Sequence, residues 1–188
     1  MDNLLFTGEK VRLAAEDAET MAKALSRWSG NSEYLRMLTT NPAVPFSQKA
    51  TKKWLDEFLG KIEEQPDHFP FAIYTLEDNR LIGHIGLDGI QWNHGDAFVG
   101  IGIGERDFWS KGYGTDAMRV LLRYAFMELN LHRVTLDVFE YNPRAIRAYE
   151  KAGFVIEGRS RQYLLREGKR WDMIFMGILR EEWERRTL

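Results

Sequence analysis

The sequence of 188 residues contains no cysteine. Disulfides, thiolate metal ligands and a cysteine nucleophile are therefore excluded, and we assign no metal site. No apolar run approaches the roughly 20 residues that a membrane span needs, and the N-terminus lacks a basic segment followed by an apolar one. We therefore expect no membrane partner and a cytoplasmic location. The formal net charge is only -2, so the chain has no basic footprint for nucleic acid.

Length and composition are those of an ordinary globular protein. The chain is 44% hydrophobic and 29% charged, and it shows no repeat, linker or low-complexity tract. At this length a chain buries roughly two-thirds of its unfolded surface, which is enough for one core. We expect a single domain over residues 1–188.

Hydrophobic periodicity predicts an α/β fold. Alternating or β-branched runs predict strands at Lys10–Leu13, Phe71–Leu76, Leu81–Trp92, Ala97–Gly104 and His132–Phe139, followed by a hairpin of Phe154–Leu165 and Lys169–Leu179. Helical spacing predicts helices after Glu16 and Asp17, at Asn31–Leu38, after Ser47, from Gly112, at Asn142–Gly153 and at Arg180–Leu188. In the helix after Ser47, we expect Trp54, Phe58, Leu59 and Ile62 to face the core.

The connections predict the sheet order in the middle of the chain. Short turns join the three strands between Phe71 and Gly104, so these should form an antiparallel meander. A helix then carries the chain to His132–Phe139, and such a crossover joins parallel strands. We expect a mixed, mostly antiparallel sheet with one central parallel pair.

A phosphate-binding site is predicted where Gly112-Tyr113-Gly114-Thr115 opens an amphipathic helix. Glycines allow the backbone to approach an anion closely, and the free N–H groups and the dipole of a helix start favour negative charge. Gly112, Gly114 and Ala117 also fit a dinucleotide fingerprint. That interpretation fits poorly, because about seven residues separate the strand from the first glycine, whereas the fingerprint follows its strand directly. A Walker loop is absent, since no Gly-Lys-Ser/Thr follows.

Two segments together resemble the GNAT superfamily of acyl-CoA N-acyltransferases. Trp109-Ser110-Lys111-Gly112-Tyr113-Gly114-Thr115 is similar to its pyrophosphate loop. About thirty residues later, Asn142, Ala145, Tyr149 and Lys151-Ala152-Gly153-Phe154 follow its second motif. Within the superfamily the chain resembles the RimJ/RimL and spermidine acetyltransferase branch, from Val11 to about Leu179. The resemblance implies a GNAT fold with a splayed central parallel pair, and acetyl-CoA as cosubstrate.

The resemblance also implies which residues contact the cofactor. The pantetheine arm would meet the backbone of Gly102, Ile103 and Gly104. The pyrophosphate would be bound by Trp109, Ser110, Lys111, Gly112, Tyr113, Gly114 and Thr115, with Asn142, Ala145, Tyr149 and Lys151 contributing from the second motif. Trp109 replaces the usual Arg or Gln, which is tolerable because the donors there are main-chain N–H groups. Asn142 is also a natural helix cap, and both roles are compatible.

Tyr149 is the predicted catalytic residue. Acyl transfer from a thioester expels a thiolate whose parent thiol has a pKa of about 8.5, so a nearby phenol with a pKa of about 10 can protonate it. The resemblance assigns Tyr149 the same role. The alternative is a tyrosine that only packs its ring beside Ile146.

The group that deprotonates the attacking amine is left open. Asp88, His94, Glu105 and Asp137 are candidates by position, although turns or sheet hydrogen bonds explain them equally well. Gly100, Gly102 and Gly104 predict a bulge in their strand. Such a bulge would splay the parallel pair and turn a strand N–H toward the thioester oxygen, as in the family.

The acceptor is expected to be a primary amine, either a protein N-terminus or a small molecule. Spermidine acetyltransferases carry an acidic loop after the first helices, whereas Met37–Phe46 contains no acid, which counts against a polyamine. A homo-oligomer is compatible with the sequence. The competing hypotheses are a non-catalytic acyl-CoA-binding or sensing module and a nicotinamide-binding protein.

Overall fold

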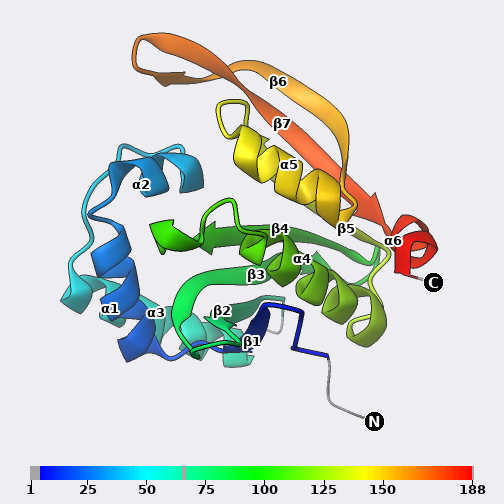
Figure 1. The fold of residues 1–188 in the computed structure, drawn as a ribbon, viewed down its shortest axis with the longest axis horizontal. Coiled ribbons are helices and arrows are strands. Elements are labelled where there is room, and N and C mark those ends of the chain that lie inside the picture. The colour runs from blue at the N-terminus through cyan, green and yellow to red at the C-terminus, as the bar shows by residue number, and fades with distance from the viewer. Residues whose placement is uncertain (1–4, 65–66, 188) are drawn as a thin grey trace.

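A seven-stranded sheet organises the protein (Figure 1). The computed structural model describes residues 5–64 and 67–187. The strands are β1 (Val11–Ala15), β2 (Phe69–Thr75), β3 (Leu81–Gln91), β4 (Asp96–Ile103), β5 (Arg133–Phe139), β6 (Val155–Arg166) and β7 (Lys169–Leu179). The helices are α1 (Ala18–Trp28), α2 (Ser32–Leu38), α3 (Gln48–Glu64), α4 (Tyr113–Arg123), α5 (Pro143–Ala152) and α6 (Arg180–Thr187). A 3-10 turn (Arg106–Phe108) precedes α4, and a π-helical turn (Tyr124–Glu128) extends it.

The sheet order is β1-β2-β3-β4-β5-β7-β6. All neighbouring strands are antiparallel except β4 and β5, which are parallel. The predicted meander, parallel pair and final hairpin are therefore confirmed. Helix α4 makes the crossover between β4 and β5, and α5 makes the connection from β5 to the hairpin.

Strands β4 and β5 separate after a short pairing. Only Asp96–Phe98 pair with Arg133–Thr135, although β4 continues to Ile103 and β5 to Phe139. The predicted splay is present, but the predicted bulge is absent at Gly100 and Gly102. The register of β4 against β3 is regular across Gly100 and Gly102, and the irregularity falls in β3 between Asp88 and Gln91, where Gly89 has a φ of 59°.

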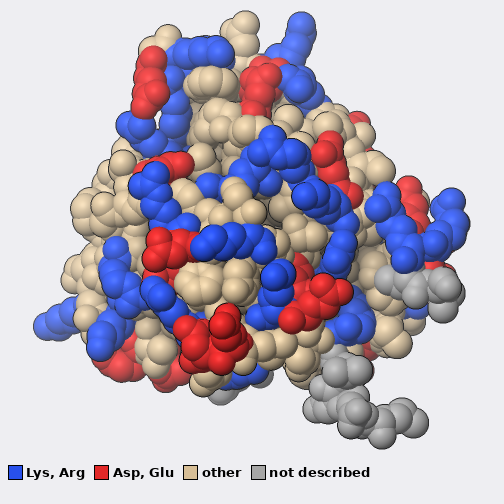
Figure 2. Space-filling model, viewed as in Figure 1, with Lys and Arg blue, Asp and Glu red and all other residues tan. Residues whose placement is uncertain are grey.

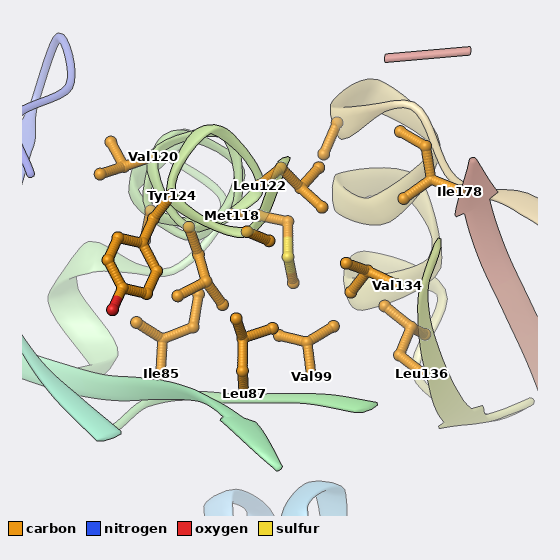
Figure 3. Close-up of a cluster of buried hydrophobic side chains, with 14 of the residues drawn as sticks. Ile85, Leu87, Val99, Met118, Val120, Leu122, Tyr124, Val134, Leu136 and Ile178 are labelled. Atoms are coloured by element: carbon orange, nitrogen blue, oxygen red, sulfur yellow. The ribbon is translucent and has the colours of Figure 1, made fainter. Parts of the chain in front are cut away.

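Apolar side chains fill both faces of the sheet. Successive residues of a strand point to opposite faces, and in β2 Ile73 belongs to the core under α4 and α5, whereas Ala72 belongs to the core under α1 and α3. Figure 3 shows the larger core, where Met118 of α4 lies above Leu87 and Val99 of the sheet. The two cores hold α4 and α5 on one face of the sheet and α1 and α3 on the opposite face, around the gap between β4 and β5.

In α3, one of the residues that was predicted to be buried is exposed, and the next residue in the chain is buried instead. Trp54 was expected to face the core, but its side chain is 55% exposed and stacks on Phe58, with ring centroids 5.2 Å apart. Leu55 is buried in its place and is only 2% exposed. A step of one residue turns a helix by about 100°, and because Trp54 and Leu55 are both apolar, the local pattern is compatible with either face.

One buried carboxylate fixes the start of α4 to β1. Asp116 accepts backbone hydrogen bonds from Glu9 (3.1 Å), Lys10 (2.7 Å) and Val11 (3.0 Å). The side chain of Lys10 is thereby held beside the loop that precedes α4, with its ammonium 5.4 Å from the ring centre of Tyr113.

Candidate active site

Two cavities meet inside the gap between β4 and β5. The first cavity, of about 400 Å³, lies between the loop before α4, the end of β4 and the start of α5. The second cavity, of about 280 Å³, lies between β3, β4, β5, α1 and α3. Both are lined by Met37, Leu38, Ile101, Asn142 and Tyr149. The two cavities are therefore neighbours, and Tyr149 is one of the residues between them.

The loop before α4 presents backbone donors to the first cavity. Ser110 and Gly112 have φ values of 59° and 89°, so the chain turns sharply into the helix. Gly112 is the N-cap of α4, and no side chain caps the helix. The first N–H groups of a helix have no partner within it, so here they are left for water or a ligand. An anion suits them best.

Basic side chains surround the same cavity. Its lining includes Lys10, Arg119, Arg144, Arg147 and Lys151. Figure 2 shows many Lys and Arg side chains on this face, over α4 and α5. A net charge of -2 for the whole chain hides this local excess of positive charge. A ligand with several phosphates would be attracted here.

Trp109 forms one wall of the first cavity. Its indole Nε1 donates a hydrogen bond to the backbone oxygen of Ile103 (2.7 Å), which ties the loop to the end of β4. The guanidinium of Arg144 lies 3.8 Å from the centre of the indole ring. The side chain at this loop position thus supports the loop and holds an arginine of α5 against it.

Most of the residues predicted to contact a cofactor come together. Those that line the first cavity are Gly102, Ile103, Trp109, Ser110, Gly112, Gly114, Thr115, Asn142, Ala145, Tyr149 and Lys151. Gly104, Lys111 and Tyr113 are not among the lining residues. Gly104 donates its N–H to Ile82 (2.9 Å) and packs against the ring of Trp28. Lys111 is exposed, and the ring of Tyr113 packs on Phe108 with centroids 4.9 Å apart.

Asn142 caps α5, as the sequence predicts. Its side-chain oxygen accepts a hydrogen bond from the N–H of Ala145 (3.2 Å), and Pro143 occupies the first turn. The residue is buried, with 6% of its surface exposed, and it lines both cavities. Because the oxygen is used by the cap, the side-chain amide N–H₂ is the part left to face a ligand.

Tyr149 presents a hydroxyl without a protein partner. Within residues 5–64 and 67–187 its hydroxyl makes no hydrogen bond, and its ring packs edge-on against Phe154. Burial, and after it the charge of Asp137, raises the pKa of Tyr149 well above the usual 10.0. The hydroxyl therefore stays protonated at neutral pH and can donate to a group placed between the cavities.

Two of the four candidate bases lie away from both cavities. His94 is in the turn between β3 and β4, beside Asn93. Glu105 binds Arg27, Arg80 and Trp28. Burial would raise the pKa of Glu105, but the hydrogen bonds from Trp28 and Arg27 and the charges of the two arginines outweigh it and hold the pKa below its usual value. A carboxylate held in this way is a poor proton acceptor.

The other two candidates, Asp88 and Asp137, line the second cavity. Burial raises the pKa of both carboxyl groups above the usual value. Asp88 is already paired, since its Oδ1 lies 3.2 Å from Nδ1 of His68. Asp137 is the more exposed of the two residues.

Two titratable residues of the second cavity were not predicted. Burial lowers the pKa of His84 to about 4, and its Nε2 lies 3.2 Å from the hydroxyl of Tyr34. Burial, followed by the charge of Asp88, raises the pKa of Glu16 to about 7. The sequence suggests only that Glu16 and Asp17 open a helix. In the structure Asp17 caps α1 by accepting the N–H of Thr20 (2.8 Å), which leaves Glu16 to face the cavity.

The comparisons with known proteins agree with this geometry. The model of the acetyltransferase (GNAT) domain matches residues 11–155. The chain belongs to the GNAT family. It is 31% identical over 179 residues to the SPbeta prophage-derived N-acetyltransferase YokL of Bacillus subtilis (strain 168), with 95% of each chain covered. The protein named "Putative ribosomal N-acetyltransferase YdaF" of the same organism is 35% identical over 109 residues, or 58% of this chain and 59% of YdaF.

A solved structure extends the likeness to the fold. The spermidine N-acetyltransferase of Vibrio cholerae, crystallised with CoA and spermine, superposes with a TM-score of 0.78 and 25% identity, covering 93% of this chain and 98% of that chain. The seven-stranded mixed sheet is therefore the GNAT fold, and the chain is an enzyme of the N-acetyltransferase type. Among the described helices of this GNAT protein, none is both long and apolar enough to cross a membrane.

Proposed function

We propose that this protein is one catalytic domain that transfers an acetyl group from acetyl-CoA to a primary amine, by direct attack with both substrates bound. One observation carries the proposal: Tyr149 lines both the first and the second cavity. A donor and an acceptor that occupy separate cavities can react directly only where the cavities join.

The first cavity suits acetyl-CoA. Its uncapped helix start and its five basic side chains match the phosphates of the ligand. Backbone of β4 beyond Phe98 has no strand partner on the β5 side, so it is available to the pantetheine arm. When bound, acetyl-CoA supplies the activated acetyl group. Gly102 and Ile103 are the residues we assign to that arm.

Tyr149 is the residue we assign as the proton donor. Its raised pKa keeps the phenol neutral until the leaving sulfur acquires charge. The proton then passes from the hydroxyl to the sulfur. A free N–H of β4 in the gap would donate to the thioester oxygen as negative charge develops there.

The second cavity suits a cationic acceptor. Its carboxylates come from the start of α1, from β3 and from β5, namely Glu16, Asp88 and Asp137. Of the acid-free segment Met37–Phe46, only Met37 and Leu38 line either cavity. The negative charge that was missing from that loop is thus supplied by other elements, and the acceptor panel has to include polyamines.

CoA release tests the proposal. Acetyl-CoA is mixed with N-terminal peptides, polyamines, amino acids and aminoglycosides, and free thiol is measured. We expect turnover with at least one primary amine. Melting temperatures with CoA, acetyl-CoA and NAD are measured in parallel, because a ligand that binds only the folded state raises the melting temperature. Stabilisation by acetyl-CoA without any turnover would support a sensing module instead. Stabilisation by NAD alone would refute the proposal.

A further inference from the structure

The acceptor amine must lose a proton, and the second cavity is lined by four ionisable groups other than tyrosine. They are Glu16 at the start of α1, His84 and Asp88 on β3 and Asp137 on β5, with Tyr149 facing them from α5. The residues that α1, α2, α3 and β4 contribute to this cavity are all uncharged.

Three of these groups are less suited to take the proton. His84 is bound to Tyr34, and burial lowers its pKa to about 4. Asp88 is paired with His68. Asp137 is more exposed to solvent than Glu16. Glu16 differs from them, because within the described ranges its carboxylate makes no hydrogen bond and no ion pair, and it is partly shielded from solvent.

The position of Glu16 also separates it from the leaving group. Glu16 lines the second cavity only, whereas Tyr149 lines both. The ammonium of the acceptor must lose a proton before the nitrogen can attack, and at that stage Tyr149 still holds its own proton, so another group has to accept it. We propose, on the basis of the proposed function, that Glu16 takes the proton from the ammonium group of the acceptor, and that its carboxylate first binds that ammonium.

The proton and bond changes balance in this arrangement. The ammonium gives one proton to the Glu16 carboxylate, and the neutral nitrogen then forms the C–N bond as the C–S bond breaks. Tyr149 gives its proton to the sulfur and regains one from the nitrogen. Glu16 releases its proton to water, so one proton is produced for each amide formed. A carboxyl group with a pKa near the working pH is the best exchanger for this step.

The test is the pH profile of kcat/KM for the best amine of the panel. With Glu16 present, we expect a plateau between about pH 7 and the pKa of the amine, because the reacting pair is carboxylate and ammonium. Glu16→Gln should lower kcat/KM about 100-fold at pH 7 and should remove the plateau. Its rate should then rise tenfold per pH unit, following the fraction of free amine.

Matched variants distinguish proton transfer by Glu16 from a general effect of its charge or a defect in folding. Glu19→Gln removes the same charge from the exposed first turn of α1 and should keep the wild-type profile. Acetyl-CoA should raise the melting temperature of Glu16→Gln as much as that of the wild type. A wild-type profile in Glu16→Gln, or loss of the plateau in Asp137→Asn instead, would overturn the assignment. Absence of turnover with every amine would refute the proposed function itself, and this inference with it.

Discussion

The hydroxyl of Tyr149 and the carboxylate of Asp137 face one cavity, and the charge of Asp137 adds to burial in raising the pKa of Tyr149. The two residues come from α5 and β5, which follow one another in the chain. The pairing keeps the phenol protonated over the pH range in which amines are acetylated. The neutral phenol is therefore available as a proton donor, and once it has given up its proton the phenolate readily takes one back.

Replacement of Tyr149 by Phe removes only the hydroxyl. We expect kcat to fall by about 100-fold, which is the usual contribution of a general acid, with little change in the melting temperature or in stabilisation by acetyl-CoA. Tyr163→Phe removes an exposed hydroxyl from the β6–β7 hairpin and should leave kcat unchanged. Wild-type kcat in Tyr149→Phe, with the fold intact, would exclude the acid role.

Glu16 should make the stability of the protein depend on pH. Its pKa is about 7 when folded and near 4.5 when unfolded, so between these values the unfolded chain releases the proton first. The free energy of unfolding of the wild type, relative to Glu16→Gln, should therefore fall by about 3 kcal/mol as the pH rises from below 4.5 through 7, and become level about one pH unit above 7. Urea unfolding at pH 5 and pH 8 measures this. An equal difference at both pH values would show that Glu16 is not desolvated.

Glu105 should act in the opposite sense. Trp28 and Arg80 donate to its carboxylate at 2.7 Å and 2.6 Å, and its pKa lies below the usual value. The contribution of Glu105 to the free energy of unfolding should be complete above the pKa of a glutamate in the unfolded chain. It should disappear as the pH falls through the lowered pKa of Glu105 in the folded protein. At pH 7, Glu105→Gln should lower the free energy of unfolding by about 1–3 kcal/mol.

The matched control for Glu105 is Glu33. The side chain of Glu33 is 43% exposed, and its ion pair with Arg106, whose side chain is 71% exposed, spans 3.4 Å. Glu33→Gln should change the free energy of unfolding by less than about 1 kcal/mol, because exposed ion pairs contribute little. Equal effects of the two variants would mean that the hydrogen bonds to Glu105 do not stabilise the fold.

The proposed phosphate-binding loop before α4 can be tested by comparing Gly112 with Gly168, because both glycines have a positive φ. Their φ values are 89° and 72°, and no backbone atom obstructs an added methyl group at either position. Replacement by Ala should cost each about 1–2 kcal/mol of stability. Only Gly112→Ala should weaken acetyl-CoA binding, by about tenfold, because Gly168 lies in the β6–β7 turn. Calorimetric titration with acetyl-CoA compares them. Equal affinities would place the phosphates elsewhere.

The sequence predicts the elements of this fold well because their signals are local. The glycines before α4, the Asn142 cap and the alternation in β5 each lie within a few residues of the structure they specify. The parallel pairing of β4 and β5 also follows, because a helical crossover leaves few alternatives.

Predictions that depended on packing between distant segments were less complete. Trp54 and Leu55 are neighbours in an amphipathic helix, and the packing of this helix against α1 and the sheet decides which is buried. Glu16 has an ordinary sequence context, and its raised pKa arises from the fold and from Asp88, which is 72 residues away. The location of the bulge in β3 rather than β4 likewise depends on cross-strand register.

The three residue pairs that join β4 to β5 have a consequence for how activity emerges during folding. Glu16 belongs to the β1–β4 part of the sheet and Tyr149 to the part that follows β5, and these pairs are the sheet's connection between the two parts. Either part could form its own strand pairs first, but neither holds both of the residues that we propose transfer protons. Recovery of turnover on refolding should therefore coincide with the joining of the two parts, and should lag behind the formation of secondary structure.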